Sequence, residues 1–117
     1  MVWTRKYPDE QSYRGPAYLI TTKFGSSVFP PSEENLANTV ASEVESNGYR
    51  MLRIEISKKE VIPVLYYEFT VDTYCYSPSG AGLPFPFLIV GLIIAAIIAL
   101  GIIWLISQNV KEIVYGV

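Results

Sequence analysis

RMLRIEISK at residues 50–58 and VLYYEFTVDTYC at residues 64–75 carry the clearest structural signal in this chain. In both stretches apolar side chains such as Ile54 and Phe69 alternate with polar ones. A period of two residues is typical of a strand with one buried face. The polar pair Lys59–Glu60 between the stretches suits a turn. The two stretches therefore predict an antiparallel hairpin.

A helix is expected immediately before this hairpin, beginning after Ser32 and ending near Gly48. Serine is a preferred N-cap residue, and the two glutamates that follow it would face the positive end of the helix dipole. Glycine commonly stands just past the last helical turn. The apolar residues recur every four positions, at Leu36, Val40 and Val44. Such a stripe predicts a helix that buries one side only.

A third strand is indicated by AYLITTKF at residues 17–24, which is rich in β-branched and aromatic residues. The predicted order is thus β-α-β-β, an α+β fold in which one helix covers a three-stranded sheet over residues 17–76. Residues 1–16 show no regular period and contain prolines and glycine, so we expect an extended N-terminal arm there.

The C-terminal part of the chain contains FLIVGLIIAAIIALGIIWLI, residues 87–106, without one charged side chain. A helix of this length would span about 30 Å, the thickness of the hydrocarbon core of a bilayer. We therefore expect a single transmembrane helix at 87–107, preceded by a proline- and glycine-rich linker at 77–86 and followed by a short tail at 108–117.

Two features of this expected helix concern its surroundings. Aromatic residues near its ends resemble membrane-interface anchors, namely Phe85, Phe87, Trp104 and Tyr115. Small residues every four positions would allow close packing of another helix, and these are Gly91, Ala95 and Ala99. An alternative is that glycine and alanine are simply common in membrane helices.

The expected topology rests on two opposing arguments. Lys111 is the only basic residue close to the span on its C-terminal side, which favours a C-terminus on the inside. The absence of an N-terminal signal peptide and the late position of the span favour tail-anchored insertion instead. The second argument predicts an N-terminal domain on the cytosolic side of a membrane, or facing the capsid in a virion.

Composition argues against catalysis. The chain has no histidine and one cysteine, Cys75, and it contains none of the common phosphate-binding, zinc-protease or serine-hydrolase motifs. The net charge of −2 shows no basic excess, which argues against nucleic-acid binding. We therefore expect no enzyme activity, no cofactor or metal and no small-molecule substrate. For Cys75 we expect a small buried strand residue rather than a reactive thiol.

The nine tyrosines suggest contacts with other proteins, because tyrosine combines a large rigid surface with a hydrogen-bonding tip. A three-stranded sheet with one helix leaves its second face uncovered. The aromatic residues expected to contact a partner are Trp3, Tyr7, Tyr13, Tyr66, Tyr74 and Tyr76. The alternative is that the N-terminal arm folds back over this face.

Together these observations favour a non-enzymatic, membrane-anchored structural or accessory subunit of a larger assembly. That assembly could be a multi-protein membrane complex or a virion in which the protein links membrane to capsid. The expected partners are other protein chains and the lipid bilayer. The alternative is a membrane-active, holin-like or toxin-like protein that oligomerises through its transmembrane helix.

Overall fold

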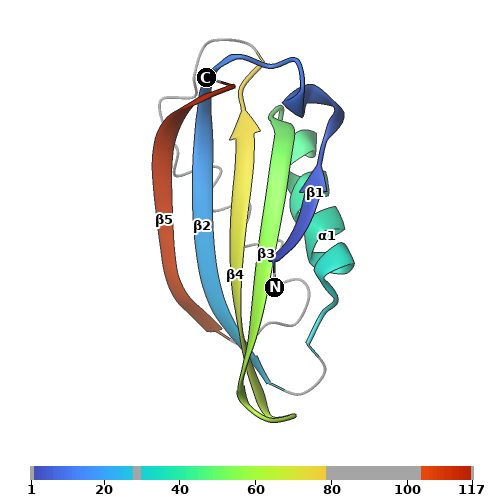
Figure 1. Ribbon diagram of the computed structural model, residues 1–117, viewed down its shortest axis with the longest axis vertical. Helices are drawn as coiled ribbons and strands as arrows, with labels where there is room; N and C mark the ends of the chain where they lie inside the picture. The colour runs from blue at the N-terminus through green and yellow to red at the C-terminus, as the bar shows by residue number, and fades with distance from the viewer. Residues whose placement is uncertain (1, 28–29, 79–103, 117) are drawn as a thin grey trace.

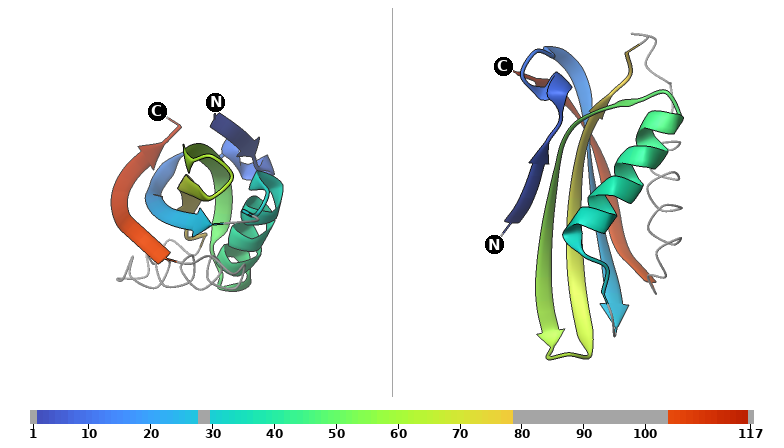
Figure 2. Two further views of the ribbon diagram at one scale, coloured as in Figure 1. Left: turned by 90° about the horizontal axis from the view of Figure 1, so that it is seen from below. Right: turned by 90° about the vertical axis from the view of Figure 1, so that its right-hand side faces the viewer.

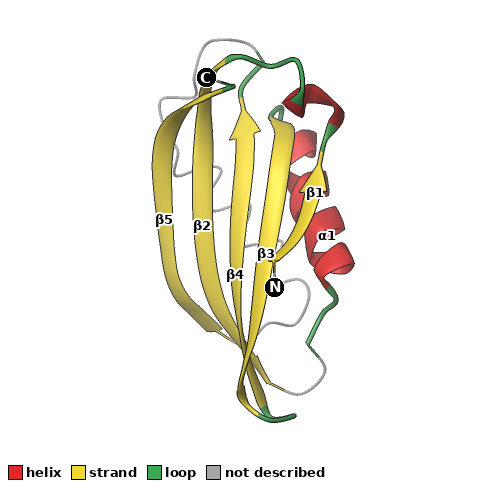
Figure 3. Cartoon of the chain, viewed as in Figure 1, coloured by secondary structure: helices red, strands yellow, loops and turns green. Residues whose placement is uncertain are grey.

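A computed structural model of the chain describes residues 2–27, 30–78 and 104–116. Strands make up most of this part of the chain (Figure 3). In chain order the elements are β1 (Val2–Lys6), the short 3-10 helix η1 (Pro8–Glu10), β2 (Gly15–Ser27), α1 (Glu33–Ser46), β3 (Arg50–Ile62), β4 (Tyr66–Tyr76) and β5 (Trp104–Tyr115).

The five strands form one antiparallel sheet in the order β1-β3-β4-β2-β5 (Figure 1). Only β3 and β4 are joined directly as a hairpin. The other three pairings join segments that are distant in sequence. Thr4 of β1 lies opposite Glu55 of β3, and Leu19 of β2 lies between Tyr74 of β4 and Lys111 of β5. Viewed along the strands, the sheet is strongly curled (Figure 2, left).

Helix α1 crosses one face of the sheet (Figure 2, right). It begins as the sequence indicates, because the Ser32 hydroxyl accepts a hydrogen bond from the Asn35 amide at 3.1 Å. Its apolar stripe packs in a core with side chains of β2, β3 and β4, and the Phe24 and Phe69 rings stack with centroids 5.1 Å apart. The buried members of this core are Ile20, Phe24, Leu36, Ala37, Val40, Val44, Tyr49, Met51, Ile54, Ile56, Phe69, Val71 and Cys75.

The opposite face of the sheet, called here the open face, carries the polar residues of the same strands. The Thr21 hydroxyl of β2, for example, donates to the Asp72 carboxylate of β4 at 2.6 Å. Along β4 every buried residue alternates with a half-buried one, from Phe69 to Tyr76. The alternation that the sequence shows is therefore expressed as one apolar and one polar face.

The predicted three-stranded sheet is wrong, because the sheet has five strands. The two additional strands come from segments expected to be an arm and a tail. Val2–Lys6 extends the sheet beside β3, and residues 104–115 extend it beside β2. The reason is that a strand at the edge of a sheet is stabilised by backbone hydrogen bonds to a neighbour, which need no periodic pattern in its own sequence.

The predicted single-pass membrane helix is also not supported. Within residues 2–27, 30–78 and 104–116, no helix combines the length and the apolar character needed to cross a bilayer. A single-pass, tail-anchored localisation therefore lacks support. The last residues of the predicted span, from Trp104 on, lie in strand β5. A run of isoleucine, leucine and tryptophan fits a strand as well as a helix. Here pairing with β2 selects the strand.

Several predicted positions lie outside the described residues. They are Phe85, Phe87, Gly91, Ala95 and Ala99.

Candidate functional site

An exposed apolar surface lies at the tip of the β3–β4 hairpin, residues 61–65, which we call the hairpin tip. It projects beyond the other strands at one end of the molecule (Figure 1). Four of its five residues are large, apolar and exposed, with exposed fractions from 43% to 72%. They are Val61, Ile62, Val64 and Leu65. Contiguous apolar residues at a protruding point are typical of an interaction site.

The backbone of the hairpin tip explains how these side chains are presented. The Ile62 carbonyl accepts a hydrogen bond from the Leu65 amide at 3.0 Å, which closes a four-residue turn. Pro63 occupies the second position of the turn, and Val64 occupies the third with a φ of +65°. A proline followed by a residue of positive φ is the pattern of a type II turn, where glycine or asparagine is preferred. A β-branched residue there is strained by about 1–2 kcal/mol.

The charges that flank the hairpin tip in sequence cancel. Lys58, Lys59 and Glu60 precede it, and Glu68 follows it. The Lys58 ammonium lies 4.8 Å from the centre of the Tyr67 ring, which holds it close to the protein surface. The residues that flank the hairpin tip in sequence therefore carry no net formal charge.

A pocket of about 400 Å³ lies next to the hairpin. Its charged lining residues are three lysines and one glutamate, namely Lys23, Lys58, Lys59 and Glu68, and Val2 and Ile106 are apolar neighbours. A second pocket, of about 490 Å³, involves the ends of β2 and β5 and is lined partly by Tyr13 and Tyr18. Among the described residues of its lining, Glu112 is the one that carries a charge. The described part of neither lining contains two carboxyl groups that could serve as an acid and base pair.

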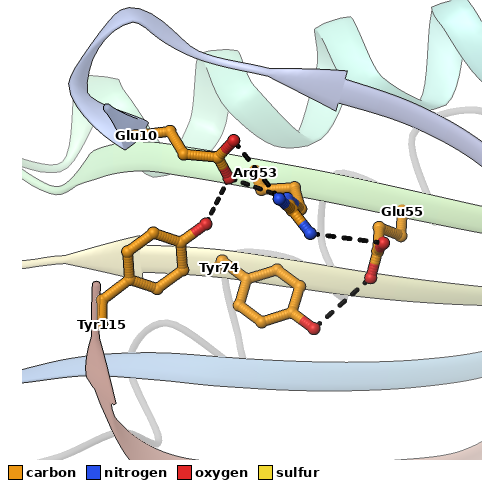
Figure 4. A network of polar contacts seen from close by, with 5 residues as sticks. All are labelled: Glu10, Arg53, Glu55, Tyr74 and Tyr115. Carbon is orange, nitrogen blue, oxygen red and sulfur yellow. Dashed lines mark hydrogen bonds and ion pairs between the residues drawn. The ribbon is translucent and has the colours of Figure 1, made fainter. Parts of the chain in front are cut away.

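At the end of the open face that lies away from the hairpin tip, a polar network starts from η1 (Figure 4). The Glu10 carboxylate accepts hydrogen bonds from the Arg53 guanidinium, with Nε at 2.7 Å and Nη2 at 3.4 Å. It also accepts one from the Tyr115 hydroxyl. Arg53 further contacts Glu55 at 3.7 Å, and Glu55 accepts a hydrogen bond from Tyr74 at 3.4 Å.

Asp9, the neighbour of Glu10 in η1, is bound in the same way. Its carboxylate accepts hydrogen bonds from the Tyr76 hydroxyl at 2.7 Å and from Arg50 Nε at 3.2 Å. The Tyr76 ring in turn stacks on Tyr13 at 3.7 Å between centroids. Each η1 carboxylate thus has one arginine of β3 and one tyrosine of another strand, Tyr76 of β4 for Asp9 and Tyr115 of β5 for Glu10. We call this arrangement of Asp9 and Glu10 with their partners the η1 latch.

The electrostatics of the η1 latch favour ionised carboxylates. The hydrogen bond from Tyr76, aided by Arg50, lowers the pKa of the Asp9 carboxyl. Burial of Glu10 acts in the opposite direction, but the hydrogen bonds from Arg53 and Tyr115 outweigh it and lower the pKa of that carboxyl. Burial, followed by the hydrogen bond to Glu10, raises the pKa of the Tyr115 hydroxyl. Carboxylates so well paired are suited to holding η1 on the sheet and poorly suited to proton transfer at neutral pH.

No metal-binding cluster is present in the part of the chain that the structure describes: no three His, Cys, Asp or Glu side chains there come together as ligands. Cys75 is buried in β4, as expected from the sequence, and burial raises the pKa of its thiol to about 12. The thiol is therefore protonated and inert at neutral pH.

The aromatic residues predicted to contact a partner are in several places. Tyr74, Tyr76 and Tyr13 lie in or against the η1 latch. The Tyr13 hydroxyl also donates to the Pro16 carbonyl at 2.6 Å. These residues are therefore engaged within the chain, in line with the alternative that the N-terminal segment folds back over this face.

The remaining predicted residues lie elsewhere. Trp3 and Tyr7 are partly buried against the core, and Arg5 lies over the Trp3 ring at 5.1 Å. The Tyr66 hydroxyl donates to Glu68 at 3.4 Å, close to the hairpin tip. Tyr115, predicted as a membrane anchor, belongs to the η1 latch.

Sequence reasoning did not single out the hairpin tip. Val64 and Leu65 are expected to begin the second strand of the hairpin, and the turn is expected at Lys59–Glu60. In the structure β3 continues to Ile62 and the turn lies at residues 63–65. One available signal was Pro63, since proline favours the second position of a turn. Comparisons with protein-family models, curated proteins and solved structures give no match to this chain.

Proposed function

We propose that this protein is a non-enzymatic accessory or structural subunit that binds a partner protein through its hairpin tip. The observation that carries the proposal is Val64, which is 72% exposed and has a backbone conformation that disfavours valine. Strained backbone is retained where it serves a function. A strained, exposed valine improves neither the stability nor the solubility of the protein. It does improve binding to a partner that offers an apolar pocket.

The shape and charge of the hairpin tip favour a protein partner over a lipid surface. Peripheral membrane binding normally combines apolar side chains with a clear basic excess. Here two lysines and two glutamates flank the tip in sequence, at positions 58, 59, 60 and 68, and Lys23 of β2 adds one positive charge beside them, which is a slight excess. A narrow apolar projection with a mixed-charge rim instead resembles the centre and edge of a protein interface. The partner surface should therefore offer an apolar pocket.

Site-specific photo-crosslinking tests this proposal. In one variant of the chain a photoreactive phenylalanine analogue replaces Val64. In the control variant it replaces Glu45, an exposed helix residue. Both are expressed at native level in the source cells. We expect one discrete protein adduct from position 64, its loss when Leu65→Ser is added, and no such adduct from position 45.

Native complex size provides a second measurement. The double variant Val64→Gly/Leu65→Ser should no longer sediment with the partner protein but as the free chain. Its thermal unfolding should remain cooperative. Unchanged sedimentation of this variant would contradict the proposal. Flotation with vesicles of phosphatidylcholine and phosphatidylglycerol tests whether the hairpin tip binds lipid instead. If the protein floats with the vesicles, if flotation requires Leu65 and if position 64 crosslinks to lipid only, the hairpin tip binds a membrane and the proposal of a protein partner is wrong.

A further inference from the structure

Among the described strands β5 is the last of the sheet, and its outer edge is exposed to pairing with another strand. One edge of β5 is paired with β2, from Tyr115 opposite Gly15 to Trp104 opposite Gly25. No described strand lies against its other edge (Figure 1). Strand edges present backbone amides and carbonyls that can pair with another strand. The register with β2 is continuous from Ser107 to Tyr115, so this part of β5 is regular.

The sequence of this regular part, SQNVKEI at residues 107–113, is complementary to itself. In an antiparallel pair of two β5 strands with a two-fold axis at Val110, residues equally distant from Val110 face each other. Asn109 then lies opposite Lys111 of the second copy, and Gln108 opposite Glu112. An amide faces a charged group in each case, and no like charges meet. Val110 faces Val110, which suits β-sheet pairing.

Neighbouring registers fit less well. Moving the axis to residue 111 places Lys111 opposite Lys111, which is unfavourable. Moving it to residue 109 places Val110 opposite Gln108 and Lys111 opposite Ser107, so that Lys111 no longer directly faces an amide. Lys111 and Glu112 are exposed, and neither has an ion-pair partner among the residues that the structure describes. The register at Val110 provides both with a neighbour.

From this self-complementarity we propose that two copies of the chain associate through β5, antiparallel about Val110, and so continue the sheet across the dimer. This goes beyond the proposed function. It uses a different surface from the hairpin tip, so either proposal can fail without the other.

Charge changes at Asn109 test the register. Asn109 is exposed and its replacement should leave the monomer intact. Asn109→Glu would place a carboxylate opposite Lys111 of the second copy, twice per dimer, and Asn109→Lys would place two like charges there. From the usual strength of such cross-strand pairs we expect the dimer dissociation constant to fall by about 2-fold to 30-fold in Asn109→Glu and to rise by a similar factor in Asn109→Lys.

The measurement is sedimentation velocity of the full chain over a range of concentrations, with thermal unfolding as the control for folding. A wild-type chain that is monomeric at all concentrations up to about 1 mM would overturn the proposal. Equal dissociation constants for the two variants would overturn it too.

Disulfide trapping gives an independent test of the two-fold axis. Val110→Cys places two thiols opposite each other, and the buried Cys75 should not compete. We expect mild oxidation to give a covalent dimer of Val110→Cys and little dimer of Lys111→Cys. Efficient dimer formation by Lys111→Cys alone would reject the axis at Val110.

Discussion

Val64 has a backbone conformation that its β-branched side chain disfavours. It has a φ of +65° at the third position of a turn, where the side chain of valine collides with its own backbone. Its side chain is 72% exposed, so little packing compensates for this strain. Glycine adopts the same conformation freely. The strain therefore belongs to the side chain, and a single substitution can remove it.

We expect Val64→Gly to raise the free energy of unfolding by about 1 kcal/mol, because relief of the strain exceeds the entropy that glycine adds to the unfolded chain. Urea denaturation measures the change. Leu65→Gly is the matched control: Leu65 is exposed as well, but it has no positive φ, so that variant should be no more stable than the original. A Val64→Gly protein that is less stable than the original would show that the side chain contributes packing.

At the scale of the element, α1 is stabilised by its cap as well as by its core contacts. The Ser32 hydroxyl accepts from the Asn35 amide, one of the amides that a helix leaves without an internal partner. Ser32→Ala should lower the free energy of unfolding by about 1 kcal/mol. Ser42→Ala, on the exposed side of the same helix, should be neutral or slightly stabilising. Equal effects of the two substitutions would argue against the cap.

The η1 latch makes the stability of the protein depend on pH. The pKa values of Asp9 and Glu10 are lowered in the folded state. As the pH falls, the two carboxylates therefore take up protons at a higher pH in the unfolded chain than in the folded one. Their stabilisation of the fold is present at neutral pH and is lost as the pH falls through and below the ordinary range of carboxyl groups. We expect the melting temperature to decrease between about pH 5 and about pH 2.

Replacing both latch carboxylates tests this origin. In Asp9→Asn/Glu10→Gln the melting temperature should be lower at pH 7 and should change less between pH 5 and pH 2. Glu60→Gln, an exposed carboxylate at the far end of β3, serves as the control and should keep the original pH dependence. If the melting temperature of the double variant changed with pH as steeply as that of the original, the acid sensitivity would come from other groups.

For the whole molecule, the central question is how much β5 contributes. It is paired with β2 over most of the length of both strands, and its Tyr115 binds Glu10 of η1. Its removal would leave the outer edge of β2 unpaired and take Tyr115 out of the η1 latch. A chain truncated after residue 103 should therefore lose cooperative unfolding in calorimetry and tend to aggregate.

A truncation after Tyr115 keeps β5 complete and should unfold like the full chain. If the chain that ends at residue 103 still unfolded cooperatively at a similar temperature, the fold would not depend on β5. A strand on which the fold does not depend would be a poor base for the proposed dimer.

Local signals in the sequence determined three parts of this protein. Ser32 and the stripe from Leu36 to Val44 specify a helix, and the alternation in 50–58 and 64–75 specifies two paired strands. Each of these depends on residues close together in the chain, so pattern and propensity are sufficient. The turn predicted at Lys59–Glu60 lies instead at residues 63–65, because strands can extend past the point where alternation becomes weak.

Tertiary structure alone decided the rest. Val2–Lys6 becomes a strand because it pairs with residues about 50 positions away, and residues 104–115 become one because β2 lies beside them. Their own side chains are compatible with an arm or a membrane helix. The η1 latch likewise joins Glu10 to Tyr115 across most of the chain. Backbone hydrogen bonds between distant segments leave no period in either sequence, and they form only when the core has already brought the segments together.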